Sequence, residues 1–165
     1  MKRGREKRIF YAMVRRVYID NSVIGGVFDD EFSVHSTRLF EEFDRGIYVP
    51  VISVLTLEEI EGAPIDVINF FNRIKQGIEL ITISEDVLFL SNEYIREGRL
   101  SKKLRLDAMH IACASLNKVD IIASWNFKHI VNLDKIRIYN GVNLRLGLPM
   151  IEIRSPREII HEEEI

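Results

Sequence analysis

The chain has 165 residues, 47% of them apolar and 29% charged, with a formal net charge of −2 and a single cysteine. Its length and composition predict one globular domain with a full core, and its charge excludes an overall basic protein, so any contact with nucleic acid has to use local basic patches. No apolar run approaches the roughly 20 residues of a transmembrane helix, and the lone Cys113 suits a reducing compartment, so we expect a cytoplasmic protein without a membrane segment.

The two ends of the chain differ in composition from its middle. Residues 1–12 hold five Lys and Arg residues against one acid, and they predict a basic, disordered arm, with Met13 as an alternative start. Residues 156–165 predict an acidic C-terminal tail. We therefore expect one folded domain over residues 13–155.

Between these ends, short β-branched or aromatic runs alternate with stretches of helical spacing. Pro50 predicts an edge or irregular position for its strand, because proline cannot donate to a ladder. The alternation predicts an α/β protein, a three-layer α/β/α sandwich around a mainly parallel sheet. In chain order, we expect a strand over 16–19, a helix over 31–45, a strand over 47–53, helices over 55–61 and 64–76, a strand over 78–83, helices over 85–98 and from 101, a strand over 119–124, a partial helix over 133–143 and a strand over 150–153.

Asp107 lies in a predicted helix with a narrow surface of small and apolar residues, Ala108 and Ala112 among them, so this helix is expected to pack closely on a sheet. A carboxylate is costly to bury there unless it pairs with a cation or binds a metal. Sites in open α/β sheets form beyond the carboxyl ends of the strands. Asp20 follows the first strand, Glu59 lies shortly after the second, and Asn126 follows the fourth, so all four residues are expected at one edge.

Three carboxylates at one edge repel one another in the ionised state unless a cation lies between them. Oxygen ligands without a His or Cys set favour Mg²⁺ or Mn²⁺ over zinc. Such an ion can activate water and neutralise charge on a phosphodiester. Acids at strand ends also serve as helix caps, and the residues by themselves do not decide between a helix-cap role and a metal-ligand role.

Four stretches of the chain stand out as motifs: VYIDNS over residues 17–22, ISVLTLEEI over 52–60, LDAMHIA over 106–112 and DIIASWNF over 120–127. In these stretches the chain resembles the PIN-domain family, and within it the VapC-like toxins of type II toxin–antitoxin systems. The likeness extends over about residues 14–155, and the four motifs occur in the family's order.

The resemblance implies a PIN-like fold and a metal-dependent endoribonuclease, with Asp20, Glu59 and Asp107 holding Mg²⁺ or Mn²⁺. It also implies a toxin role, a cognate antitoxin protein that covers the active-site groove, and a homodimer. The family's second acid stands six positions after the serine of its motif, which favours Glu59 over Glu58. Many members carry an acid where this chain has Asn126, so Asn126 is expected to be a weaker, neutral ligand or to position water.

Several other side chains have both a functional and a plain structural interpretation. His110, one helical turn after Asp107, either orients a ligand or packs in the core. Trp125 either stacks on a base or lies at the rim of the core. Asp120, at the start of the fourth strand, is expected to point away from the site. The densest basic cluster is expected either to hold an RNA backbone or to be a solvated face, and it consists of Arg96, Arg99, Lys102, Lys103 and Arg105.

Two other classes of protein remain compatible with the sequence. The first is a PIN-like module that binds RNA or a partner with weak or no catalysis, which Asn126 keeps open. The second is a receiver-type signalling domain, in which Asp20 accepts a phosphoryl group. That class needs adjacent acids before the first-strand carboxylate and a late lysine after a strand, and neither is evident.

Overall fold

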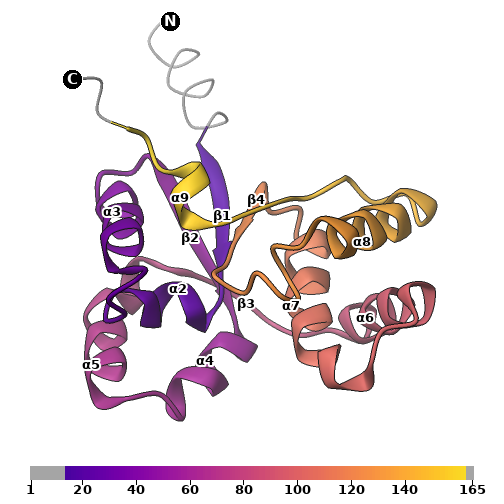
Figure 1. The fold of residues 1–165 in the computed structure, drawn as a ribbon, viewed down its shortest axis with the longest axis horizontal. Coiled ribbons are helices and arrows are strands. Elements are labelled where there is room, and N and C mark those ends of the chain that lie inside the picture. Colours follow the sequence, from indigo (N-terminus) through magenta and orange to yellow (C-terminus); the bar gives the residue numbers. More distant parts are fainter. Residues whose placement is uncertain (1–13, 163–165) are drawn as a thin grey trace, which may run out of the picture.

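The computed structural model describes residues 14–162, and at its centre lies a sheet of five parallel strands (Figure 1). The strand order is β3-β2-β1-β4-β5, so β1 is the middle strand. Because every neighbouring pair is parallel, the carboxyl ends of all five strands lie at the same edge. The strands are β1 (Arg15–Ile19), β2 (Tyr48–Ser53), β3 (Glu79–Ile81), β4 (Ile121–Ala123) and β5 (Glu152–Arg154).

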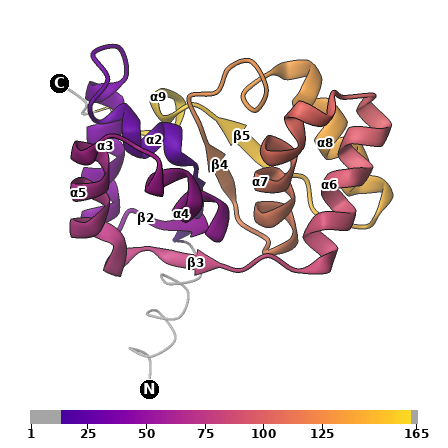
Figure 2. The same cartoon turned by 90° about the horizontal axis from the view of Figure 1, so that it is seen from below.

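Helices cover both faces of the sheet, as Figures 1 and 2 show. One layer consists of α2 (Asn21–Gly26), α3 (Ser33–Asp44), α5 (Ile65–Ile74) and α9 (Pro156–Ile159). The opposite layer consists of α6 (Glu85–Gly98), α7 (Arg105–Leu116) and α8 (Leu133–Arg145). The short α4 (Val54–Glu61) follows β2, and two single 3₁₀ turns, η1 (Lys75–Gly77) and η2 (Lys102–Leu104), precede β3 and α7.

The core consists of two hydrophobic clusters, one on each face of the sheet. β1 shows the division, because Val17 and Ile19 belong to one cluster and Tyr18 to the other. A strand that is buried on both faces is typical of a parallel sheet between two helical layers. The predicted three-layer α/β/α architecture is therefore confirmed.

α7 buries its small residues against the sheet, as its sequence predicts. Ala108 and Ala112 are fully buried, and so is Cys113. Burial raises the pKa of the Cys113 thiol to about 11, so this cysteine stays protonated and unreactive at neutral pH. Asp107 lies in the first turn of α7, and the packing of the helix thereby holds this carboxylate at the carboxyl edge of the sheet.

The expected edge position of Pro50 is wrong, because β2 lies inside the sheet between β3 and β1. The ladder that joins β2 to β3 begins only at Val51. Pro50 therefore lies outside that ladder, and its missing N–H costs no hydrogen bond to β3. Helix α8 is also longer than the partial helix expected over residues 133–143.

The structure also corrects the prediction of an acidic tail from residue 156 onwards, because residues 156–159 form the helix α9. The helix is capped where the backbone N–H of Ser155 donates to Glu158 Oε2 at 2.8 Å. Ile159 is buried, and its carbonyl accepts a hydrogen bond from the Tyr48 hydroxyl at 2.9 Å. The buried Ile159 thus extends the packed domain beyond residue 155.

The basic arm predicted for residues 1–12 lies outside the described residues, as do residues 163–165. Over residues 14–162, no helix is both long enough and apolar enough to cross a bilayer.

Trp125 is packed tightly into the layer that holds α2 and α3. Its ring stacks on Phe32 with a centroid distance of 4.3 Å and an interplanar angle of 17°. Its indole N–H donates to Ser36 Oγ at 2.8 Å, and Ser36 in turn donates to the carbonyl of Val23 at 2.9 Å. A Cβ added at Gly26 would lie 2.5 Å from Ser36 Oγ, so only glycine fits beside this hydrogen-bonded pair.

We predict opposite effects of alanine at two adjacent glycines of α2. Gly26→Ala should destabilise the fold by about 1–3 kcal/mol, because its Cβ meets side chains that hydrogen bonds hold in place. Gly25→Ala, whose Cβ would meet nothing within 4 Å, should be neutral or should stabilise by about 0.5–1 kcal/mol through helix propensity. Urea unfolding of both variants measures the difference. Equal effects of the two substitutions would contradict the packing that we describe.

Candidate active site

The structure brings the four predicted residues together beyond the carboxyl ends of the strands. Asp20 follows β1, Glu59 lies on α4 after β2, and Asn126 comes three residues after β4. Asp107 reaches the same edge from the first turn of α7. The three carboxylates interact electrostatically, since Glu59 contributes to raising the pKa of both Asp20 and Asp107.

Asp20 is the most buried of these acids, with only 6% of its surface exposed. Its Oδ2 accepts a hydrogen bond from Ser124 Oγ at 2.6 Å, and its Oδ1 accepts one from the Ser22 hydroxyl. Burial raises the pKa of the Asp20 carboxyl, while His110 and the two hydroxyls oppose that rise. Oδ1 also caps α2 by accepting from the N–H of Val23 at 3.4 Å, so the helix-cap interpretation applies to Asp20 as a second role. With both oxygens engaged inside the protein, this environment does not favour phosphoryl transfer to Asp20.

Glu59, and not its neighbour Glu58, faces the site. Glu58 is exposed, whereas Glu59 Oε1 accepts a hydrogen bond from His110 Nε2 at 3.0 Å. The second oxygen, Glu59 Oε2, is buried and has no hydrogen-bond partner among the described residues. An unsatisfied buried carboxylate oxygen is costly, and a bound cation would relieve that cost.

His110 holds Glu59 in place through a chain of hydrogen bonds that sequence reasoning did not reveal. His110 Nε2 is hydrogen-bonded to Glu59 Oε1, and His110 Nδ1 lies 2.6 Å from the Tyr18 hydroxyl. Tyr18 Oη lies 2.7 Å from Ser53 Oγ, which also accepts from the N–H of Leu55 at the start of α4. His110 is therefore both a core residue and a residue that orients an acid, so its two interpretations hold together.

Asp107 is half-buried, and its surroundings disfavour its ionised form. Burial raises the pKa of its carboxyl, and the nearby Asp20 and Glu59 carboxylates add to the rise, while His129 and His110 oppose it. Asn126 Nδ2 lies 3.4 Å from Asp107 Oδ1 and donates to it. Two carboxyl groups with raised pKa values at one edge are the electrostatic signature expected of a site that functions with a cation.

The amide oxygen of Asn126 is already engaged. It accepts a hydrogen bond from the backbone N–H of His129 at 3.0 Å, and the N–H of Asn126 itself donates to Ser124 Oγ at 3.0 Å. With its oxygen turned to the backbone and its NH₂ group turned to Asp107, Asn126 fits the role of a positioning residue better than that of a metal ligand.

The donor chemistry of the site fits a hard divalent cation. Asp20, Glu59 and Asp107 offer carboxylate oxygens, which Mg²⁺ and Mn²⁺ prefer, and Glu59 Oε2 lacks a partner. In the part of the chain that the structure describes, no group of three or more His, Cys, Asp or Glu side chains is gathered closely enough to hold a metal as it stands. The three carboxylates would therefore have to converge on the ion when it binds.

A cavity of about 520 Å³ opens beside Glu59 and includes Asn21 and Gly25 in its lining. Asn21 Oδ1 is another buried atom without a hydrogen-bond partner within residues 14–162. Both residues line this cavity, and their two unsatisfied oxygens are buried behind its wall. The sequence signal for Asn21 was its place directly after Asp20, but its residue type alone did not single it out.

The other residues singled out in the sequence lie at some distance from this chemistry or support it indirectly. Asp120 accepts from the N–H of Arg16 at 2.7 Å, at the opposite end of β1, as expected. Trp125 is 92% buried within the domain, which confirms its core interpretation. The basic cluster is exposed around η2 and the start of α7, so it borders the helix that carries Asp107, and it comprises Arg96, Arg99, Lys102, Lys103 and Arg105.

Comparisons with known proteins find no matching family model and no matching curated protein. Solved structures do match. VapBC2 from Rickettsia felis, bound to a DNA fragment from its promoter, is 11% identical with a TM-score of 0.55, over 85% of this chain and 98% of that chain. A toxin–antitoxin complex from Klebsiella pneumoniae is 19% identical with a TM-score of 0.52, over 72% and 93% of the two chains. FitAcB from Neisseria gonorrhoeae is 10% identical with a TM-score of 0.57, over 87% and 99%.

At these identities the likeness establishes the fold alone. The match extends over nearly the full length of each of those chains, so it concerns a whole domain and not a shared substructure. This chain therefore has the three-layer α/β/α fold that is found in chains of toxin–antitoxin complexes.

Proposed function

We propose that this chain is a metal-dependent endoribonuclease that hydrolyses RNA phosphodiester bonds, and that it is the toxin of a toxin–antitoxin pair. The observation that carries the proposal is the gathering of Asp20, Glu59 and Asp107 at one edge, with Glu59 Oε2 buried and unpartnered. The toxin role is supported by the fold that the chain shares with chains of toxin–antitoxin complexes.

In this proposal Asp20, Glu59 and Asp107 hold Mg²⁺ or Mn²⁺. The chemistry supplied by such an ion is a lowered pKa for an attacking water and neutralisation of charge on the phosphodiester. The Ser22 and Ser124 hydroxyls keep Asp20 oriented and oppose its protonation. They do so in a buried environment, where hydrogen bonds to a carboxylate are strong.

The remaining roles fall to residues around the acids. His110 orients Glu59, and Asn126 orients Asp107 and positions the attacking water. The basic cluster around η2, defined above, holds the phosphates of the RNA backbone, because cations beside an acidic pocket offset its repulsion of the substrate. Lys128, in the exposed turn after Asn126, is placed to make one further phosphate contact.

The proposed partners are a cognate antitoxin protein and a second copy of this chain. The antitoxin would cover the acidic edge, and a homodimer would form through helices on one side. Within α5, Val67 and Phe71 are buried in the core, so these two side chains are not available for contacts with either partner.

A second candidate function is an RNA- or partner-binding module with weak or no catalysis. It is favoured by Asn126, whose amide oxygen is taken by a backbone N–H, and by acids that are not gathered into a ligand cluster among the described residues. Retained RNA binding without cleavage in Mg²⁺ or Mn²⁺ would establish this module.

Substitution of single acids tests the nuclease directly. Asp107→Asn and Glu59→Gln should each lower RNA cleavage by a factor on the order of 10²–10³, because each removes a charge that the transition state depends on. Glu58→Gln, the matched control on the exposed side of α4, should leave cleavage unchanged. The measurement uses a pool of structured RNAs with Mg²⁺, Mn²⁺ or excess chelator. Cleavage that persists in Asp107→Asn, or in chelator, would refute the proposed mechanism.

Cation binding should also raise the free energy of unfolding of the protein. At about 100 times its dissociation constant, Mg²⁺ adds about 2.7 kcal/mol, which for a chain of this size corresponds to a rise in Tm of about 5–10 °C. Because the raised pKa values of Asp20 and Asp107 make both carboxyls easier to protonate, the rise should shrink as the pH falls and should be largest at alkaline pH. Asp107→Asn should abolish most of it. A rise that is equal in wild type and variant would place the ion elsewhere.

A third substitution separates the positioning role of His110 from that of a ligand. His110→Gln should lower cleavage by about 10- to 100-fold, as is usual for a residue that orients a ligand. Its Mg²⁺ titration should shift to weaker binding instead of disappearing. Loss of both binding and fold would instead mean that the link between Tyr18 and Glu59 is needed for folding, and a thermal melt without metal distinguishes the two outcomes.

A further inference from the structure

A second cavity, of about 520 Å³, lies directly beside the acidic edge and has aromatic walls. We call it the aromatic cavity, and its principal lining residues are Phe32, His35, Trp125, Phe127, Val131 and Arg157. Its volume falls within the range of roughly 300–1,000 Å³ that is usual for small-molecule sites.

Two of its three aromatic rings are held rigidly. Trp125 is fixed by its hydrogen bond to Ser36 and by the close approach of Gly26, and Phe32 is stacked on it. The third ring, Phe127, is different, because half of its surface is exposed. It stands at 63° to Trp125, with 6.0 Å between the ring centroids. The rings therefore form a corner with one fixed wall and one open aromatic face.

The aromatic cavity adjoins the candidate active site on one side. A neighbouring cavity of about 320 Å³ is lined by Asn21, Ser22 and Asn126, and it shares Phe32 and Trp125 with the aromatic cavity. Phe127 itself follows Asn126 directly in the chain. The segment that carries Phe127 therefore also carries Asn126, a residue of the acidic edge.

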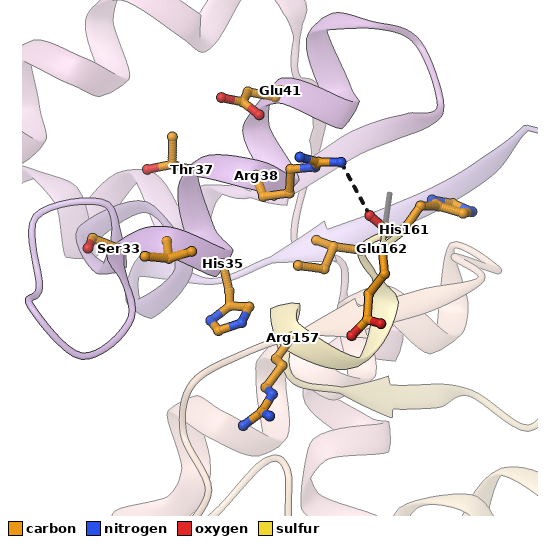
Figure 3. A pocket seen from close by; sticks show the side chains of 10 residues that line it. Ser33, His35, Thr37, Arg38, Glu41, Arg157, His161 and Glu162 are labelled. Carbon is orange, nitrogen blue, oxygen red and sulfur yellow. Dashed lines mark hydrogen bonds between the residues drawn. The ribbon is translucent and has the colours of Figure 1, made fainter. Parts of the chain in front are cut away.

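On its other side the aromatic cavity leads into a groove of about 730 Å³ between α3 and α9 (Figure 3). The two spaces share His35 from α3 and Arg157 from α9. Figure 3 shows His35 on α3 and Arg157 on α9, with both side chains extending to the same side. The cavity also contains the carboxylates of Glu31 and Glu158, but Glu158 is engaged by the backbone and hydroxyl of Ser155. Arg157 thus offers a cation for a phosphate at the far end of the aromatic corner.

We propose that the aromatic cavity is a nucleobase subsite, in which the base next to the scissile phosphate stacks on Phe127 while Arg157 contacts a neighbouring phosphate. This subsite rests on the nuclease function proposed above and names a feature of its substrate, an unpaired nucleotide beside the cut. Stacking on an aromatic ring tolerates any base, so the subsite selects unpaired structure over sequence.

The test measures the fluorescence of Trp125, the one tryptophan in the chain, which reports on this cavity from its wall. The four ribonucleoside 5′-monophosphates, a single-stranded RNA of about eight nucleotides and ribose 5-phosphate are titrated in excess chelator. The nucleotides and the RNA should change the fluorescence, and ribose 5-phosphate, which lacks a base, should not. Phe127→Leu should weaken nucleotide binding by about 5- to 150-fold, the usual contribution of one stacked base.

Three further variants sharpen the result. Phe127→Tyr keeps the aromatic face and should retain binding. Phe89→Leu, the matched control on the distant α6, also changes a phenylalanine that is more than half exposed and should leave binding unchanged. Arg157→Gln should weaken all four nucleotides equally. A nucleotide affinity of Phe127→Leu equal to that of wild type, or a response to ribose 5-phosphate as strong as that to nucleotides, would overturn the subsite.

Failure of the subsite and failure of the nuclease are distinguishable, because binding is measured without cleavage. Base-dependent binding by a wild-type protein that cuts no RNA would support the subsite and refute the nuclease. RNA cleavage combined with unchanged fluorescence for nucleotides and RNA would refute the subsite alone, and the aromatic lining would then be available to a protein partner.

Discussion

The burial of three carboxylates at the carboxyl edge of one parallel sheet is the constraint on which the rest of this structure depends. Asp20, Glu59 and Asp107 come from three different elements, and all three are at least partly withdrawn from water. Desolvation and repulsion by neighbouring carboxylates both oppose the ionised forms of Asp20 and Asp107, and they raise the pKa values of these two carboxyls. A fold that is arranged only for stability would place apolar residues there.

The surrounding polar network offsets part of this cost. Asp20 receives two hydroxyl hydrogen bonds, and Glu59 receives one from His110. His110 is itself fixed by the Tyr18 hydroxyl in the middle of the core. The compensation is incomplete, because one oxygen of Glu59 is left without a partner among the described residues. That residual cost is the physical reason for treating the edge as a binding site and not as a set of helix caps.

The turn after β4 connects the acidic edge to the aromatic cavity. Four consecutive residues contribute in different ways: Ser124 supports Asp20, Trp125 anchors the wall, Asn126 donates to Asp107, and Phe127 exposes its ring. Chemistry and substrate positioning would therefore be set by one short segment. The fold that carries this segment is shared with chains of toxin–antitoxin complexes at 10–19% identity, so the fold supplies the scaffold and the side chains decide the activity.

The sequence by itself determined the fold class, the strands with most of their helices and the four residues expected at one edge, because hydrophobic periodicity and the ends of parallel strands follow from local pattern. It did not predict the short helices α2 and α9. Tertiary structure decided what depends on contacts between distant segments. It placed Pro50 in an inner strand and folded residues 156–159 onto the domain, since both outcomes depend on which neighbours supply hydrogen bonds and apolar surface. Likewise, it alone linked Tyr18 to Glu59 through His110 and paired the amide oxygen of Asn126 with the backbone N–H of His129, because a side chain's hydrogen-bond partners are set by packing and not by residue type.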